Sequence, residues 1–228
     1  MTGTPPVYRV GLVGYRRGRA LAEAWRGVEG ARLVAVADLL PERREQARQE
    51  LDGIACYPDH LAMLAAADLD VLTIATTGAF HAQIVRDATA RGVRGIYCEK
   101  PMACSLADAD AMIADCRAAR TVLTIGHQRR WMEQIRRIRA AIREGAIGRP
   151  THGYVYWATG RIGTEGTHFL DALAYILDSP PVEVSGATRF GLDPVGIGDD
   201  AGYGPRMAAD PGVMGFVTFA SGVRVAVD

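Results

Sequence analysis

The sequence has no excess of either charge and no long apolar segment. Its 26 basic residues balance 26 acidic ones, which argues against nucleic acid or an anionic membrane as a partner. No uninterrupted apolar run approaches the roughly 20 residues that a membrane-spanning helix requires, and the first residues carry no apolar targeting segment. We therefore expect a soluble, cytoplasmic protein.

Cysteine is scarce and forms no metal or redox motif. The four cysteines (Cys56, Cys98, Cys104 and Cys116) include no C-x-x-C pair and no histidine at metal-ligand spacing. We expect reduced thiols and no bound metal. Aromatic residues are also few, but 49% hydrophobic and 23% charged residues are typical of a folded globular protein.

Short β-branched segments alternate with longer amphipathic ones along residues 1–126. The segment 71–75 is apolar on both faces, as in a parallel sheet with helices on both sides. The pattern predicts the α/β class, with a doubly wound parallel (Rossmann) sheet in a first domain over 1–126. Strands are expected over 8–13, 32–37, 54–57, 71–75, 95–98 and 122–125, and helices over 18–28, 41–51, 59–66, 81–91 and 105–119. Asp59 and Ser105 are expected helix N-caps.

The pattern changes after Gly148-Arg149-Pro150. It predicts a smaller α+β domain over 127–228 with a mainly antiparallel sheet, entered through a linking helix over 131–145. Strands are expected over 151–157, 181–188, 212–219 and 223–227, a helix over 167–177 and a loop over 191–211. So few strands leave an open edge. We therefore expect an incomplete domain whose edge is covered by a second copy of the chain, as a homo-oligomer, or by another partner.

A glycine-rich turn follows the first expected strand. Gly14 and Gly18 flank Tyr15, Arg16 and Arg17 just before a helix. Glycine in such a turn lets backbone N–H groups approach a pyrophosphate at a helix N-terminus. The usual G-x-G-x-x-G spacing is one residue short here, so a purely structural strand-to-helix turn is the alternative interpretation.

Asp38 closes the second expected strand. A carboxylate there accepts hydrogen bonds from the adenosine ribose hydroxyls and repels a 2′-phosphate, which favours NAD over NADP. The alternative is that Asp38 caps the helix beginning near Pro41. Arg43 and Arg44 could argue for a 2′-phosphate, but we expect both to be exposed beyond the helix start.

An ordered set of segments resembles one known family. Glu99-Lys100-Pro101 at a strand end is similar to the E-K-P motif of the glucose–fructose oxidoreductase / inositol dehydrogenase / rhizopine catabolism (Gfo/Idh/MocA) oxidoreductases. The other matching segments are 38–43, 76–81, 126–130, 148–150 and 166–171. The resemblance extends over about residues 7–228.

The resemblance implies an NAD(P)-dependent dehydrogenase that transfers a hydride between nicotinamide and a hydroxyl or carbonyl carbon of a sugar, cyclitol or similar polyol. It implies a cis Lys100-Pro101 bond, with Lys100 stabilising negative charge on the reacting oxygen and His168 exchanging the proton. The implied cofactor contacts are Gly14, Tyr15, Arg16, Gly18, Asp38, Thr76, Thr77, His81, Glu99 and Lys100. The implied substrate contacts are Lys100, His127, Arg129, Arg130, Thr164, His168 and Asp171.

Simpler interpretations stand beside these roles. Lys100 before a proline could be an exposed loop residue, and His168 a polar surface residue at a helix start. Asp171 could only form a salt bridge or cap, while His127, Arg129 and Arg130 could shape a pocket wall.

The chain departs from the family at several points. Thr164 stands where many active members have an aspartate, and a threonine cannot titrate usefully. Thr77 replaces the proline of the common Thr-Pro dipeptide, the glycine turn is short, and the strands that complete the family's second sheet are missing. A second hypothesis is therefore a truncated or degenerate member that binds nucleotide or a partner chain without catalysis.

Overall fold

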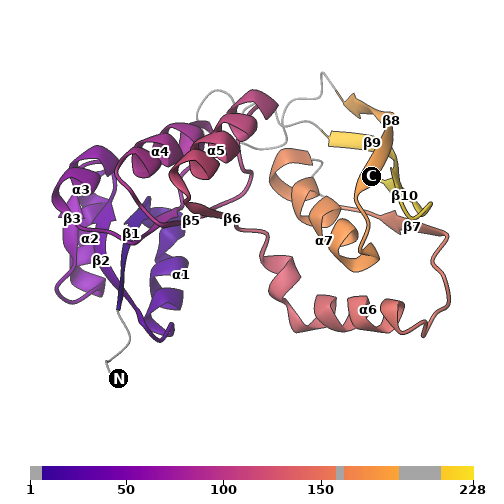
Figure 1. Cartoon of the computed structure of the whole chain (residues 1–228), viewed down its shortest axis with the longest axis horizontal. Helices are drawn as coiled ribbons and strands as arrows, with labels where there is room; N and C mark the ends of the chain where they lie inside the picture. Colours follow the sequence, from indigo (N-terminus) through magenta and orange to yellow (C-terminus); the bar gives the residue numbers. More distant parts are fainter. Residues whose placement is uncertain (1–6, 158–161, 190–211) are drawn as a thin grey trace. The chain divides into compact units, whose positions relative to one another are not determined.

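A computed structural model describes residues 7–157, 162–189 and 212–228. The chain divides into two compact units, 1–126 and 127–228 (Figure 1). The loop expected over 191–211 lies outside the described residues.

The first unit is built on a six-stranded parallel sheet in the order β3-β2-β1-β4-β5-β6. The chain starts in the middle of this sheet and moves outward in both directions, so the expected doubly wound Rossmann fold is confirmed. Between β1 and β4 the order reverses, and in such sheets ligands bind outside the carboxyl ends of the strands at this switch point. The strands are β1 (Tyr8–Val13), β2 (Ala31–Ala37), β3 (Ala55–Tyr57), β4 (Val71–Ile74), β5 (Gly95–Cys98) and β6 (Val122–Ile125).

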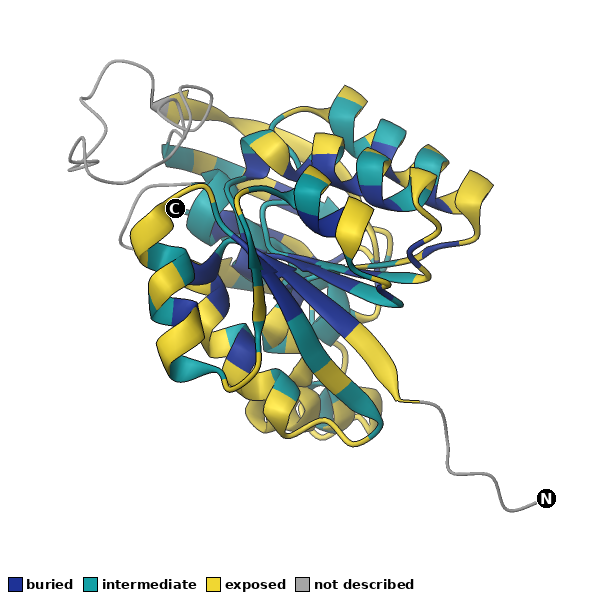
Figure 2. Cartoon of the chain, turned by 90° about the vertical axis from the view of Figure 1, so that its left-hand side faces the viewer, coloured by how far each residue is buried: buried dark blue, intermediate teal, exposed yellow. Residues whose placement is uncertain are grey.

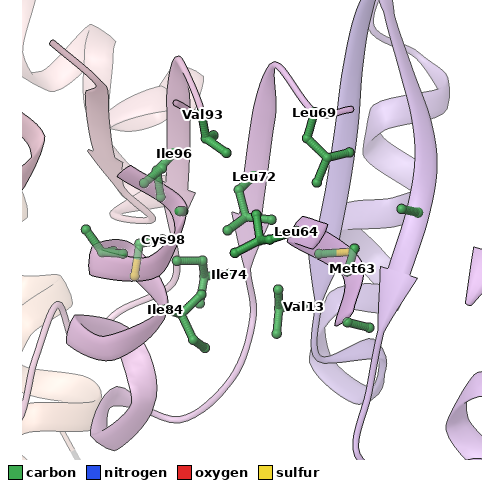
Figure 3. Packing of buried hydrophobic residues seen from close by; sticks show 14 of the residues in the cluster. Val13, Met63, Leu64, Leu69, Leu72, Ile74, Ile84, Val93, Ile96 and Cys98 are labelled. Carbon is green, nitrogen blue, oxygen red and sulfur yellow. The ribbon is translucent and has the colours of Figure 1, made fainter. Parts of the chain in front are cut away.

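Helices cover the two faces of this sheet. They are α1 (Tyr15–Arg26), α2 (Pro41–Glu50), α3 (His60–Ala66), α4 (Gly78–Ala90) and α5 (Leu106–Ala119). The first two pack on one face around Leu12 and Val36, and the other three pack on the opposite face around Leu72, Ile74 and Ile96 (Figure 3). Buried residues therefore concentrate along the middle strands (Figure 2). Each such fully buried Leu or Ile contributes roughly 1.5–3 kcal/mol to folding.

Local capping follows the expected pattern at two helices. The Asp59 carboxylate accepts a hydrogen bond from the Ala62 N–H (2.7 Å), and the Ser105 hydroxyl accepts one from the Asp108 N–H (3.1 Å). Two helices begin three residues earlier than expected: α1 begins at Tyr15 rather than at Gly18, and α4 begins at Gly78 rather than at His81.

The second unit contains a four-stranded sheet in the order β7-β10-β9-β8. Among the described strands of this unit, β7 and β10 pair in parallel and the other two pairs are antiparallel, so the expectation of a mainly antiparallel sheet is confirmed. The expected linking helix is divided into a 3₁₀ turn and a shorter α-helix. The elements are η1 (Gln128–Trp131), α6 (Glu133–Arg143), β7 (His152–Val155), η2 (Ile162–Gly166), α7 (Thr167–Leu177), β8 (Pro181–Arg189), β9 (Gly212–Phe219) and β10 (Arg224–Val227).

Helix α7 packs its apolar side on one face of this sheet, against Val217, Phe219 and Val225. Within the described residues of the whole chain, no helix is long and apolar enough to cross a membrane.

Candidate active site

The turn between β1 and α1 is a single residue, Gly14, with φ 89° and ψ 95°. A Cβ at this position would lie 2.9 Å from the Ala75 carbonyl oxygen, just beyond β4. Only glycine combines this backbone conformation with so close an approach. The turn is therefore packed directly against the switch point of the sheet.

Asp38 organises the carboxyl ends of β1 and β2. One carboxylate oxygen accepts a hydrogen bond from the Tyr15 N–H (2.7 Å), and the other accepts one from the Leu40 N–H (3.0 Å) just before α2. The first bond explains why α1 starts early, because a carboxylate satisfies its first N–H and favours a helix N-terminus. Asp38 therefore caps the start of α1, whereas α2, whose N-cap is Leu40, has no side-chain cap. Since each oxygen has two lone pairs, this half-buried carboxylate can still accept from a ribose diol.

The other residues predicted around the glycine turn differ in how far they are exposed. The side chain of Tyr15 is only 1% exposed, and its hydroxyl donates to Glu50 (2.8 Å). Burial and the Glu50 carboxylate raise the pKa of Tyr15 to about 12. Gly18 is buried against Leu12. Of Tyr15, Arg16 and Gly18, the exposed Arg16 is therefore the residue positioned to meet a ligand at the start of α1, because the Tyr15 N–H already donates to Asp38.

Arg43 and Arg44 are half-buried, so the expectation that both are exposed is wrong. The Arg44 guanidinium donates to the carbonyl oxygens of Asp38 (2.8 Å) and Leu39 (2.9 Å). These bonds hold the arginine against the segment that leads into α2.

Thr76 and Thr77 follow β4 at the switch point. The Thr77 side-chain oxygen is buried and makes no hydrogen bond within the described part of the chain. A buried hydroxyl without a partner is uncommon and indicates a missing polar ligand or water. Together with the acceptor capacity of Asp38 and the N-terminus of α1, this oxygen gives the carboxyl edge of the sheet groups that fit a dinucleotide.

The Lys100-Pro101 peptide bond is cis, as the resemblance implied. The Lys100 N–H donates to one oxygen of the half-buried Glu99 carboxylate (3.3 Å). Lys100 is also the only lysine of the chain, in which all the other strongly basic residues are arginines.

Tyr97 is a site residue that our sequence analysis missed. Its hydroxyl donates to the second oxygen of Glu99 (3.4 Å), and a Cβ at Gly126 would lie 2.7 Å from that hydroxyl. Burial and the charge of Glu99 raise the pKa of Tyr97 to about 12, so the phenol stays a donor. Two-residue alternation along β5 places Tyr97 and Glu99 on the same face, and this was the signal available in the sequence.

Arg17, at the start of α1, was also missed. Packing around its guanidinium lowers the pKa of Arg17, and the charges of Glu99 and Arg16 act on it in opposite directions, Glu99 raising it. The Glu99 carboxylate thus has a cationic neighbour in the first turn of α1.

His81 is fully buried one turn into α4. Its ring nitrogens face the carbonyl oxygens of Thr76, Pro101 and Met102 at 3.0–3.2 Å. A fully buried ring surrounded by protein carbonyl groups is not accessible to a dinucleotide. The predicted cofactor contact at His81 therefore becomes a contact between two loops of the protein itself.

The second unit brings together the histidines that the sequence singled out. His168, in the first turn of α7, is 6% exposed rather than a surface residue. Its ring lies edge-on to the ring of His127, with centroids 5.9 Å apart. Thr164 lies half-buried in the π-helical turn η2 that leads into α7.

Asp171 and the two arginines form contacts within this unit. Arg130 donates two hydrogen bonds to the Asp171 carboxylate (2.7 and 2.8 Å). This bidentate ion pair raises the pKa of Arg130. The Arg129 guanidinium lies 4.1 Å from the centroid of the Phe169 ring. These groups hold η1 against α7, as the alternative structural interpretation of Asp171 proposed.

Comparison with known proteins places the chain in a family. The sequence profile described as "Oxidoreductase family, NAD-binding Rossmann fold" (Gfo/Idh/MocA) matches residues 8–127, more than half of the chain. The D-apiose dehydrogenase of Paraburkholderia graminis is 42% identical over 132 residues, which are 58% of this chain and 35% of that enzyme. The inositol 2-dehydrogenase of Rhizobium meliloti is 30% identical over 210 residues, 86% of this chain and 62% of that enzyme.

A solved structure agrees with these sequence relatives. The oxidoreductase from Agrobacterium radiobacter, in complex with NAD+, L-tartaric acid and magnesium, superimposes with a TM-score of 0.82 at 27% identity, over 97% of this chain and 66% of that one. This chain spans about a third to three-fifths of the length of the two curated relatives named above. The chain belongs to the Gfo/Idh/MocA oxidoreductase family, whose first domain is an NAD-binding Rossmann fold.

Proposed function

We propose that this protein is an NAD-dependent dehydrogenase that acts on a hydroxyl or carbonyl carbon of a sugar, cyclitol or similar polyol. The observation that carries the proposal is the position of Asp38, Gly14 and Lys100 at the carboxyl edge of one parallel sheet. Family membership and relatives named as apiose and inositol dehydrogenases support the reaction class.

Different residues at this edge would bind different parts of the cofactor. Asp38 would accept from the adenosine ribose hydroxyls, and the N-terminus of α1 at Arg16 would face the pyrophosphate. Thr76, Thr77 and Glu99 would border the redox end. NAD supplies the hydride acceptor, or as NADH the hydride donor.

Side chains of the protein would stabilise the negative charge on the reacting oxygen and exchange the proton of the reaction. Lys100 would donate a hydrogen bond to the reacting oxygen and stabilise the negative charge that develops there. Glu99, held by Tyr97 and the Lys100 N–H, would keep the lysine segment in one orientation. His168 would exchange the proton, since an imidazole titrates near neutral pH and Thr164 does not. His127, Arg129, Arg130 and Asp171 would form the wall around the polyol.

The open sheet of the second unit supports a proposal about partners. Tyr154, Ala226 and Phe216 lie side by side on the face opposite α7, and Tyr154 and Phe216 are 67% and 48% exposed. We propose that a second copy of the chain or another partner covers this sheet, because the exposed aromatic residues on either side of Ala226 form an apolar surface that favours association. Multi-angle light scattering should give a mass above 24.5 kDa, and a strictly monomeric mass at all concentrations would argue against a second copy.

Asp38→Asn tests the cofactor assignment. We expect the wild-type protein to bind NADH more tightly than NADPH, and the variant to lose about tenfold of this preference because the 2′-phosphate no longer meets a negative charge. The measurement is isothermal titration of both nucleotides.

Asp70→Asn is the matched control for this substitution. Asp70 also accepts a backbone hydrogen bond, from the Arg9 N–H (2.9 Å), but it precedes β4 at the amino edge of the same sheet. We expect its NADH-to-NADPH preference to equal that of the wild type. A wild-type protein that binds neither nucleotide at millimolar concentration would refute the proposed function.

A further inference from the structure

A single buried side chain connects the two loops that carry the proposed redox-end residues. His81 is 0% exposed, and its Nδ1 lies 3.0 Å from the Pro101 carbonyl oxygen and 3.2 Å from that of Met102. Its Nε2 lies 3.2 Å from the Thr76 carbonyl oxygen. Thr76 follows β4 and Pro101 follows β5, so the imidazole spans the gap between two neighbouring strand ends.

The chemistry of these contacts limits what the ring can do. Carbonyl oxygens only accept, and a neutral imidazole has one N–H to donate. Burial is the dominant influence on the pKa of His81 and lowers it, although the three carbonyl groups and Glu99 act in the opposite direction. The ring is therefore neutral at pH 7 and can donate to only one of the two loops.

Acceptor geometry favours the loop that carries Lys100. Nδ1 faces two carbonyl oxygens, from Pro101 and Met102, whereas Nε2 faces one. A proton on Nδ1 is stabilised by both dipoles at once. The favoured tautomer thus donates to the segment directly after Lys100.

Packing at the start of α4 supports the same contact. A Cβ at Gly78 would lie 3.2 Å from Pro101 Cγ and 3.4 Å from the Pro101 oxygen, so the helix start lies directly on the proline. Further along α4, Ile84 packs beside Ile74 and Cys98 in the core (Figure 3). Helix α4 is therefore anchored to the Lys100 loop by its first turn and to the sheet by its second turn.

We propose that His81 is a positioning residue whose Nδ1–H holds the Lys100-Pro101 loop and so sets the direction of the Lys100 amine. It acts through the loop and does not contact the dinucleotide. The significance of the Lys100 direction rests on the proposed function, but the contact itself does not.

His81→Leu tests the contact in the full chain without any cofactor. The substitution removes the donor and places an apolar side chain of similar size in the same buried position. We expect amide hydrogen exchange in peptides covering residues 99–104 to accelerate roughly tenfold, the effect of losing one hydrogen bond. The dissociation constant for NADH should change less than about threefold, because this residue is not a ligand, while kcat falls.

His60→Leu is the matched control. His60 contacts the same helix from α3, through Nε2 and the Asp87 carboxylate (2.9 Å), and is also largely buried. Its replacement should leave exchange in 99–104 at the wild-type rate. Unchanged exchange in folded His81→Leu protein, or a loss of NADH affinity above tenfold without faster exchange, would overturn the proposal.

A measurement on the wild-type protein covers the case in which His81→Leu does not fold. Ring ¹⁵N chemical shifts of histidine-labelled protein should show His81 neutral, with its proton on Nδ1 and slow to exchange with water. A proton on Nε2 would tie the ring to Thr76 instead and contradict the proposal. Hydrogen exchange and ring ¹⁵N shifts can both be measured without enzyme turnover. A protein without redox activity would therefore refute the proposed function, and these two measurements would still test the contact between His81 and the Lys100-Pro101 loop.

Discussion

Replacing Lys100 by methionine should lower kcat for polyol oxidation by about 10²–10³-fold, the usual effect of removing one donor to a developing oxyanion. Methionine keeps much of the length of the side chain and removes only the ammonium group. Affinity for NADH should change little, because the proposed contacts of Asp38 and the α1 N-terminus remain. The loss should therefore appear in kcat rather than in cofactor binding.

Steady-state rates with pentoses, hexoses and inositols, together with NADH titration, measure this effect. Lys100→Arg is the informative companion, because it keeps the positive charge but replaces a compact ammonium by a planar guanidinium. We expect it to recover only part of the lost rate. Equal rates for wild type and Lys100→Met with NADH still bound would favour the second hypothesis, a family member that binds nucleotide without catalysis.

The amine of Lys100 can be labelled selectively. Because Lys100 is the only lysine, reductive methylation with ¹³C-formaldehyde labels one side-chain amine besides the N-terminus. The lysine signal should shift when NADH is added and should be missing in Lys100→Met. A signal that does not respond to saturating NADH would place the amine away from the redox end.

Gly14→Ala should lower the free energy of unfolding by about 2–4 kcal/mol, the combined effect of a disfavoured backbone conformation and an overpacked contact. Its φ of 89° is one that alanine rarely adopts, and the new Cβ would meet the Ala75 carbonyl oxygen at 2.9 Å. NADH affinity should fall as well, because the turn also positions the N-terminus of α1, which is proposed to face the pyrophosphate.

Gly30→Ala separates the two contributions. Gly30 also has a positive φ, 76°, but a Cβ there would have no atom within 4 Å. We expect a loss of only about 1–2 kcal/mol from the backbone conformation and unchanged NADH binding. Urea unfolding of both variants provides the comparison. Equal losses would mean that the close approach to Ala75 contributes nothing.

Much of the fold was predictable because its signals are local. Strands such as 71–74 are apolar on both faces, and caps such as Asp59 and Ser105 act within three residues of themselves. The alternation of strand-like and amphipathic segments predicted the Rossmann sheet, and the resemblance to the family implied the cis Lys100-Pro101 bond. Periodicity and short-range hydrogen bonding are properties that a linear sequence displays directly.

The side-chain environments of the site were decided by contacts between distant segments. The start of α1 depends on Asp38 from the end of β2, and the buried hydroxyl of Tyr15 depends on Glu50 of α2. The same holds for the contact of His81 with Pro101 and for the pairing of Arg130 with Asp171. Residue types alone do not say which partners meet, because that depends on how the helices and strands pack. Sequence thus determined the elements and the family, and tertiary structure determined which polar groups remain available to a ligand.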